Sequence, residues 1–345
     1  MMPRPLRVAH VNDVASVGTT LVAGLRALGN EADLLDPARP GSRLRAPWRG
    51  VLAPARLAAL VAVAPRLWFG RYDIVHFHFA WKAVVGLLAG RPLIVHCHGS
   101  DVRNMPVRSL RGKVTARVLR RAAAVYYATP DLGPWVLPFR ADARFLPNPI
   151  DTALFRPTES IPARDVLVGV RLDPIKGTDD IARVLEALVA ARPSTTVTIV
   201  DLGSEVGAIH QVVGPQAELI PSIRHDAMPG LLARHRIVIG QFRVGTLGNY
   251  ELESLAAGLP VAAAFRFLEA YDEPPPLVPG SDPAAIGECV ARLLDDDDAR
   301  AVLASAGRRW VIKHHERGAI CSVLADAYRA LLARPGPDGG GDKTG

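Results

Sequence analysis

Two cationic side chains, Arg171 and Lys176, stand five residues apart, directly after an apolar run at 166–170. Gly177 and an amphipathic segment follow them, so both cations are expected between a strand end and a helix start. Fixed cations in such a place bind phosphate groups through charge-assisted hydrogen bonds. The alternative is a pair of solvated surface cations. We interpret residues 166–181 as a diphosphate-binding loop.

A second segment, residues 240–262, combines a strand end, a turn with several glycines and a helix that carries Glu253. Free N–H groups at a helix start bind anions, and a carboxylate inside the helix can accept two ribose hydroxyls. The alternatives are a tight turn and an acid stabilised by the helix dipole. The donor contacts expected here come from Gly245, Thr246, Leu247, Gly248 and Glu253. The two segments together indicate a nucleotide-diphosphate sugar rather than free phosphate.

Strands and helices alternate along the chain, which predicts parallel sheets with ligands at the carboxyl ends of the strands. A length of 345 residues fits two domains better than one core. The expected strands lie at 6–10, 73–79, 92–98, 123–128, 166–170, 196–201, 237–240 and 261–264. The expected helices include a turn around Gly18 that leads into a helix ending at 28, and segments at 179–191, 228–234, 250–257, 283–294, 299–314 and 319–332.

The composition is that of a globular protein, with 49% apolar and 22% charged residues. No apolar run reaches the roughly 18 residues that a membrane-spanning helix needs. The N-terminus lacks the pattern of a secretory signal. Cys97, Cys289 and Cys321 are scattered and form neither a disulfide framework nor a paired metal spacing. We expect a reduced, cytoplasmic protein.

The net charge of +7 is unevenly distributed. Residues 1–157 hold 22 Lys and Arg against 9 Asp and Glu, which leaves 19 against 25 for residues 158–345. A basic first half fits an anionic acceptor or peripheral contact with an anionic membrane at its inner face. The alternative is an arginine-rich composition without a partner. Nucleic acid is not expected, because aromatic and basic residues are not interleaved.

Several motifs, in this order, resemble those of the family-4 retaining glycosyltransferases, and the resemblance spans residues 5–332. YDIVHFHF and PLIVHCHGSD resemble the family's two histidine-bearing strand ends, and FLPNPIDTALFRP resembles its interdomain segment. VRLDPIKG matches its diphosphate loop and LESLAAGLPV the end of its paired-glutamate motif. LLDDDDAR and AGRRW resemble its closing helices.

The resemblance implies an α/β protein of the GT-B fold, with two Rossmann-like domains whose parallel sheets face an interdomain cleft. We place an acceptor-binding domain at 1–157 and a donor-binding domain at 158–318. A C-terminal helix at 319–333 could return to the first domain. The tail at 334–345 has no core-forming residues and is expected to be disordered.

The activity implied is transfer of a sugar, with retention of configuration, from a nucleotide-diphosphate sugar to an acceptor hydroxyl. The resemblance implies no metal and no further cofactor. It also implies that His98 contacts the donor sugar or the reaction centre; the alternative is a packed histidine. Arg171 and Lys176 would carry the leaving group. Base, sugar, acceptor and oligomeric state are not readable, and the acceptor could be lipid-linked, a polysaccharide or a small natural product.

Acceptor contacts are expected around the first strand and after the third. Gly18 leaves backbone space for an acceptor, and Asp13 and Thr19 beside it are candidates. Asp101 could bind the acceptor or cap the following helix. His96 and His98 cannot readily share a metal ion with Cys97, because alternate strand residues face opposite sides. The aspartates at 295–298 are expected to form a solvated helix connection.

One position departs from the family motif. The family has a glutamate eight residues before the one matched by Glu253, and Gly245 stands there. In the family the first glutamate contacts the sugar and the second the ribose, so Glu253 keeps the nucleotide role. Gln241, and alternatively Glu251, are candidates to replace the missing contact. Two other functions stay open. One is a nucleotide-sugar epimerase or hydrolase on the same fold, and the other, suggested by the missing glutamate, is an inactive nucleotide-sugar-binding partner.

Overall fold

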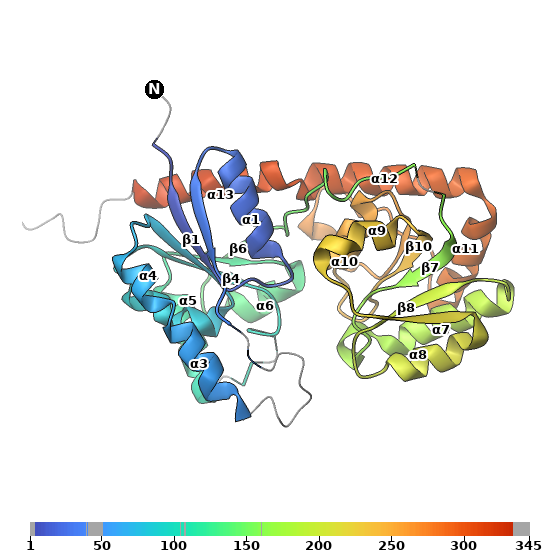
Figure 1. The fold of residues 1–345 in the computed structure, drawn as a ribbon, viewed down its shortest axis with the longest axis horizontal. Coiled ribbons are helices and arrows are strands. Elements are labelled where there is room, and N and C mark those ends of the chain that lie inside the picture. The colour runs from blue at the N-terminus through green and yellow to red at the C-terminus, as the bar shows by residue number, and fades with distance from the viewer. Residues whose placement is uncertain are drawn as a thin grey trace, which may run out of the picture. The chain divides into compact units, whose positions relative to one another are not determined.

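The computed structural model describes residues 4–38, 40, 51–103, 105, 106, 108–159 and 161–333 (Figure 1). The chain divides into two compact units. The first contains the described residues up to Ala128, then Leu132–Leu146, and the C-terminal helix from Gly318; the second contains Thr129–Asp131 and Pro147–Arg317. The division expected at residue 157 thus lies inside the second unit. The tail expected at 334–345 lies outside the described residues.

Six parallel strands form the sheet of the first unit, in the order β2-β1-β3-β4-β5-β6. The strands are β1 (Arg7–Val11), β2 (Glu31–Leu35), β3 (Ile74–His78), β4 (Leu93–Cys97), β5 (Ala124–Tyr127) and β6 (Arg144–Phe145). The helices are α1 (Val17–Ala27), α3 (Ala53–Val61), α4 (Ala64–Phe69), α5 (Leu110–Arg121), α6 (Gly133–Val136) and α13 (Arg317–Leu332), with the 3-10 helix η1 (Ala80–Leu88).

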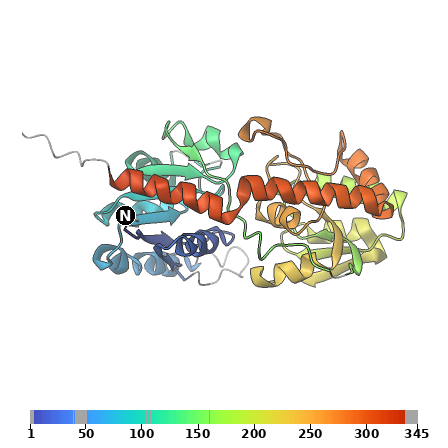
Figure 2. The same cartoon turned by 90° about the horizontal axis from the view of Figure 1, so that it is seen from above.

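The two faces of this sheet are buried by different helices. Alternate side chains of a strand point to opposite faces. Val8, Ile74 and Ile94 pack in one apolar cluster with residues of α1 and α13, and Figure 2 shows α13 lying along the sheet. Ala9, Val75 and Val95 pack in another cluster with residues of α4 and α5. Helices on both faces explain why these strands read as almost continuously apolar.

The second unit has a five-stranded parallel sheet in the order β11-β10-β7-β8-β9. Its strands are β7 (Arg164–Val168), β8 (Val197–Asp201), β9 (Ala217–Pro221), β10 (His235–Ile239) and β11 (Val261–Ala262). Its helices are α7 (Thr178–Ala191), α8 (Val206–Val213), α9 (Met228–Leu232), α10 (Asn249–Ala256), α11 (Pro283–Asp295) and α12 (Asp297–His315), with short 3-10 helices η3 (Pro174–Lys176) and η5 (His225–Ala227).

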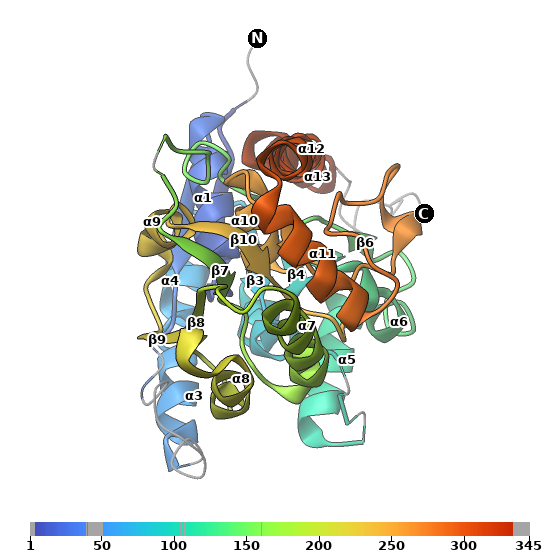
Figure 3. The same cartoon turned by 90° about the vertical axis from the view of Figure 1, so that its right-hand side faces the viewer.

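Two helix pairs cover the second sheet. One pair, α7 and α11, packs against Val166 and Ile237 and lies side by side in Figure 3. Gly287 of α11 permits this approach, because a Cβ there would lie 2.3 Å from the carbonyl oxygen of Val184. On the other face, α10 and α12 pack against Leu167. The prediction of two α/β domains with parallel sheets is confirmed.

Candidate functional site

The loop after β7 holds the two predicted cations at the carboxyl end of a strand. Asp173 organises it, since its carboxylate accepts a hydrogen bond from the backbone N–H of Lys176 (3.1 Å). Gly177 has a φ of +80°, and a Cβ there would lie 2.9 Å from the backbone nitrogen of Arg243. Glycine is therefore required where this loop turns into α7.

Both cations have partners inside the second unit. The Nε of Arg171 lies 2.6 Å from Oδ2 of Asp173, and the arginine side chain is 53% exposed. The Nζ of Lys176 donates a 2.8 Å hydrogen bond to Oε1 of Gln241, which follows β10. The Arg171 side chain is thus turned toward solvent, whereas the Lys176 side chain is held at the end of the neighbouring strand β10.

Gln241 is engaged at both ends of its amide group. Besides accepting from Lys176, it donates through Nε2 to the carbonyl of Thr246 (2.8 Å), and its side chain is buried. The backbone N–H of Gln241 donates to Oε1 of Glu251 (3.0 Å). The structure thus gives Gln241, one of the expected donor contacts, a role within the protein, which is to hold Lys176.

Glu251 closes the turn before α10. Its Oε2 accepts from the backbone N–H of Gly248 (2.9 Å), so that amide is already engaged within the protein. A Cβ on Gly240 would lie 2.6 Å from Cγ of Glu251, which explains the glycine before Gln241. Glu251 therefore shapes the loop, and nothing in its contacts directs it to a sugar.

The glycine-containing turn itself is largely buried. Gly245 has a φ of +74°, a conformation that a glutamate would adopt only with strain. Thr246 is 2% and Leu247 5% exposed, and Leu247 belongs to the apolar cluster beneath α10. The structure places these expected donor residues in the loop between β10 and α10, with the Leu247 side chain in the core.

Glu253 lies in α10 and is 4% exposed. Its Oε1 lies 2.7 Å from Nε2 of His225, in η5 after β9. Burial raises the pKa of Glu253, and the hydrogen bond from His225 partly offsets this shift. His225 is not among the site residues predicted from the sequence, and it is 28 residues away from Glu253 along the chain.

Tyr250 connects the start of α10 to the end of β7. It too is not among the site residues predicted from the sequence. Its hydroxyl accepts a hydrogen bond from the N–H of Gly169 (2.8 Å) and donates one to the carbonyl of Leu167 (3.1 Å). A Cβ on Gly169 would lie 2.6 Å from the tyrosine ring. The start of α10 is thereby fixed to the end of β7, where the cationic loop begins.

In the first unit, five histidines gather at the carboxyl ends of three adjacent strands. The register pairs His10 of β1 with His76 of β3, and His78 of β3 with His96 of β4. His98 follows β4 on the same face. The side chains of all but His98 are fully buried, and His98 is partly exposed.

Two hydrogen bonds connect three of these imidazoles. His10 Nδ1 lies 3.0 Å from His78 Nε2, and His78 Nδ1 lies 2.9 Å from His98 Nε2. Burial lowers the pKa of His10 and of His98 to about 3, and lowers the others well below the usual value. These shifts favour the neutral form of the five rings at pH 7. Ring nitrogens of His10, His76 and His78 lie within 4.8 Å of one another, as do those of His78, His96 and His98, a spacing that could also hold a metal ion.

The expected acceptor residues lie close to this cluster. Two of them, Asp101 and Asp13, accept hydrogen bonds from neighbouring groups of the protein. Asp101 is 1% exposed and accepts from the N–H groups of Ala80, His98 and Gly99. None of these belongs to the following helix α5, which Ser109 caps, so the capping alternative is wrong. Asp13 accepts from the N–H of Gly18 (2.9 Å) and from the hydroxyl of Thr19 (2.6 Å).

Gly18 lies within the first turn of α1 rather than in the turn that we expected before the helix. A Cβ on Gly18 would lie 3.1 Å from Oδ1 of Asp13 and 3.5 Å from His78. The position therefore serves close packing of the helix start against Asp13 and the histidine cluster.

The loop between β1 and α1 holds strained backbone. Asn12, Ala15 and Ser16 have φ values of 67°, 48° and 63°, which non-glycine residues rarely adopt. Asn12 donates to the carbonyl of His78 (2.6 Å) and accepts from Lys82. Such strain gathers at binding sites, where the surrounding structure holds it. It marks this loop as a second candidate site.

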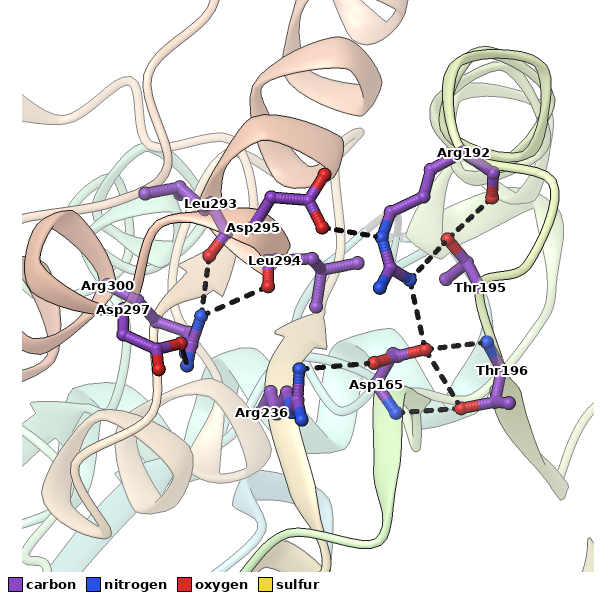
Figure 4. A network of polar contacts seen from close by, with 10 residues as sticks. All are labelled: Asp165, Arg192, Thr195, Thr196, Arg236, Leu293, Leu294, Asp295, Asp297 and Arg300. Carbon is purple, nitrogen blue, oxygen red and sulfur yellow. Dashed lines mark hydrogen bonds and ion pairs between the residues drawn. The ribbon is translucent and has the colours of Figure 1, made fainter.

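The aspartates at 295–298 serve the helix connection. Asp296 caps α12 by accepting from the N–H of Ala299 (2.9 Å). Figure 4 shows Arg192 between Asp165 (3.3 Å) and Asp295 (2.9 Å), and Asp297 paired with Arg300. Asp295, Asp296 and Asp297 thus each have a cationic or backbone partner, as a helix connection would predict. Among the described helices, none is both long and apolar enough to cross a membrane.

Comparison with known proteins supports a glycosyltransferase. The model of Glycosyltransferase Family 4 matches residues 14–154. The D-inositol 3-phosphate glycosyltransferase of Thermobispora bispora is 28% identical over 322 residues, covering 77% of this chain and 72% of that protein. The phosphatidyl-myo-inositol mannosyltransferase of Mycolicibacterium smegmatis is 25% identical over 331 residues, covering 85% and 82%.

Comparison with a solved structure identifies the type of fold. Sucrose-phosphate synthase from Thermosynechococcus elongatus superposes with a TM-score of 0.71 at 20% identity, covering 95% of this chain and 99% of that one. At this identity the likeness shows the fold alone. The fold is GT-B, as the sequence motifs predicted.

Proposed function

We propose that this chain is a retaining glycosyltransferase that moves a sugar from a nucleotide-diphosphate sugar to an acceptor hydroxyl, without a metal ion. The loop after β7 carries the proposal, because it presents Arg171 and Lys176 at the carboxyl end of a strand. Ligands of open parallel sheets bind at that end. The relatives are named transferases, which does not favour the epimerase, hydrolase or inactive-partner alternatives.

The second unit would bind the nucleotide and its diphosphate. Glu253 would accept the ribose hydroxyls, replacing or sharing its bond with His225. Arg171 would exchange Asp173 for the diphosphate, and Lys176 would reach it while held by Gln241. As the sugar leaves, negative charge grows on the diphosphate oxygen, and the two cations stabilise it.

The transfer step would follow the front-face course. The acceptor oxygen bonds to the anomeric carbon while the bond from that carbon to the diphosphate oxygen breaks. The acceptor proton passes to the departing diphosphate. We assign His98 a contact with the sugar or the acceptor hydroxyl, and the loop at residues 12–19 a contact with the acceptor. Retention is proposed from the family motifs, with the missing first glutamate at Gly245 left without a substitute.

A phosphorylated inositol is the acceptor that we propose to test first. Both named relatives act on an inositol that bears a phosphate group, free or in a lipid. The first half of this chain holds 22 Lys and Arg against 9 Asp and Glu, which suits an anionic acceptor.

The exposed face of α5 is also basic, with Arg111, Lys113, Arg117, Arg120 and Arg121. We propose that it contacts anionic lipid when the acceptor is lipid-linked. Binding of the protein to vesicles with and without phosphatidylglycerol, at two salt concentrations, would check this. Equal retention by neutral vesicles would contradict it.

The test of the function begins with thermal shifts. Purified protein is melted with UDP, GDP, ADP and their common sugar conjugates, with and without EDTA. We expect saturable stabilisation by one base that the chelator leaves unchanged. Lys176→Ala should reduce the shift strongly, whereas Lys313→Ala, which changes a half-exposed lysine paired with Asp272 and Glu273, should preserve it.

Product formation from the stabilising donor and inositol phosphate then completes the test. A sugar–inositol phosphate product with the donor's anomeric configuration is expected. No shift with any nucleotide, or binding without any transfer to inositol phosphate, polysaccharide or lipid acceptors, would contradict the proposal. Activity that EDTA abolishes and Mg²⁺ restores would contradict the metal-independent course.

A further inference from the structure

Three histidines of the first unit form a hydrogen-bonded chain that ends at its partly exposed member. The chain runs from His10 Nδ1 to His78 Nε2 (3.0 Å), and from His78 Nδ1 to His98 Nε2 (2.9 Å). At the inner end, Nε2 of His10 is buried and has no hydrogen-bond partner among the described residues. At the outer end, His98 is the one member with solvent exposure.

Burial favours the neutral form of each of the three rings, and that form carries a single ring proton. A neutral imidazole has one N–H donor and one lone-pair acceptor. Because the three rings share two hydrogen bonds, the protons can be arranged in only two ways, and each arrangement fixes all three tautomers. Either every ring donates inward, toward His10, or every ring donates outward, toward His98.

The unpartnered nitrogen of His10 decides between the two. If the rings donated inward, Nε2 of His10 would carry a buried N–H with no acceptor. If they donate outward, Nε2 of His10 is a lone pair instead. Buried N–H groups without a partner are rarer in proteins than acceptors without one. The outward arrangement is therefore favoured, because it leaves no buried N–H group of His10 without an acceptor.

We propose that this histidine chain fixes His98 as the neutral tautomer protonated at Nδ1. His10 Nδ1–H donates to His78, and His78 Nδ1–H donates to Nε2 of His98. The lone pair of His98 is then occupied, and its outward nitrogen is a hydrogen-bond donor. His10 and His78 act as positioning residues for that donor.

This tautomer sets what His98 can do in the proposed function, on which this step rests. An Nδ1–H donor can hold a hydroxyl or phosphate oxygen of a ligand. It cannot remove a proton from the acceptor, because Nε2 already accepts from His78. The acceptor proton must therefore go elsewhere, which agrees with transfer to the departing diphosphate.

Nitrogen NMR of the full chain labelled with ¹⁵N-histidine tests the tautomers directly, without donor or acceptor. Protonated and unprotonated ring nitrogens resonate in separate regions, and single His→Gln variants assign the signals. His235 and His315 are internal standards, since Nδ1 of each lies 2.8 Å from a backbone carbonyl, which can only accept. They must carry their proton on Nδ1.

At pH 7 we expect His10, His78 and His98 all to be protonated at Nδ1 alone. A pair of variants adds a second readout. His10→Leu removes the inner donor and should let His98 become a mixture of tautomers, whereas His10→Asn keeps an amide N–H near the position of Nδ1 and should restore the single form.

Three results would overturn the proposal: Nε2 protonation of His98, a charged imidazolium at pH 7, or a His98 tautomer unchanged in His10→Leu. Loss of the cluster's signals on addition of one equivalent of Zn²⁺ would overturn it too, because the rings would then form a metal site. This measurement does not depend on nucleotide binding by the second unit. The tautomer proposal can therefore fail independently of the glycosyltransferase proposal.

Discussion

At the scale of single residues, the hydrogen bond between Lys176 and Gln241 positions a cation of the proposed donor site. A flexible lysine pays rotamer entropy when it binds a phosphate. Gln241 reduces that cost in advance, because its own amide is held by the carbonyl of Thr246. Its side chain is buried, so its effect on the ligand runs through Lys176.

A double-mutant cycle measures this dependence. Lys176→Ala should lower affinity for the preferred nucleoside diphosphate by roughly tenfold or more, the size of a charge-assisted hydrogen bond. Gln241→Ala should cost less, and the double variant should match Lys176→Ala, because both changes remove one function. Isothermal titration of the four proteins gives the numbers. Strictly additive losses would mean that Gln241 contacts the ligand itself.

At the scale of elements, the start of α10 is fixed by contacts that require glycine at particular places. Glu251 accepts from Gln241 and Gly248, and it can do so because residue 240 has no side chain. Tyr250 in the same helix holds the end of β7. Two neighbouring residues of α10 therefore do the positioning. Glu251 holds the turn before the helix, and Tyr250 holds the end of β7, where the cationic loop begins.

Gly240→Ala should disrupt this arrangement. The new methyl group would lie 2.6 Å from Glu251 and displace it, which would leave two backbone amides without their acceptor. We expect a loss of about 1–3 kcal/mol in the free energy of unfolding and weaker nucleotide binding. Gly207→Ala is the matched control, because it lies in α8 with no atom within 4 Å of its Cβ position, and it should be neutral or stabilising.

Urea unfolding followed by circular dichroism compares these two variants with the parent protein. An equal change in both would show that glycine at 240 is incidental.

The sequence predicted the elements with strong apolar runs, such as β7 and β4, and their order. The edge strands β2 and β9 were missed, because their mixed polar residues lack the signal of a doubly buried strand. Around the site, spacing identified Arg171 and Lys176. It could not identify Tyr250 or His225, whose partners lie 81 and 28 residues away.

The histidine cluster shows the same limit. The alternation in HFH and HCH places each pair on one face of its strand. Only the register of β1, β3 and β4 brings His10 and the two pairs together, and register is a property of the assembled sheet.

At the scale of the whole molecule, the buried histidines make the first unit sensitive to acid. Their pKa values are lowered in the fold, to about 3 for His10 and His98, from an ordinary value of 6.5. Below pH 6.5 the unfolded chain therefore binds protons that the folded chain does not. Stability is full above pH 6.5 and falls as the pH decreases toward the folded values.

Each such histidine removes about 1.4 kcal/mol of the free energy of unfolding per pH unit in this window. We expect the midpoint of urea unfolding of the first unit to fall steeply between pH 6.5 and 5. His96→Phe should flatten the slope, because both ring nitrogens of His96 are buried without partners and an apolar ring loses nothing there. A slope unchanged by this variant would show that His96 does not contribute to the acid sensitivity.

The return of α13 to the first unit has a consequence for synthesis on the ribosome. The strands of that unit are made first, but residues of α13 such as Leu324 and Tyr328 belong to their core and are made last. Tyr328 also reaches His76, 252 residues earlier in the chain (2.5 Å). Until those residues emerge, α1 covers this face of the first sheet without α13, so part of its apolar surface stays open.

The second unit, by contrast, is almost continuous and is complete once Arg317 has been added. Vectorial folding usually proceeds from the N-terminus, but here the later-made unit can finish before the earlier one. During translation of the second unit, the nascent first unit carries an uncovered apolar surface. A chaperone would bind this apolar surface during that interval. A nascent chain arrested before residue 318 would keep the surface exposed.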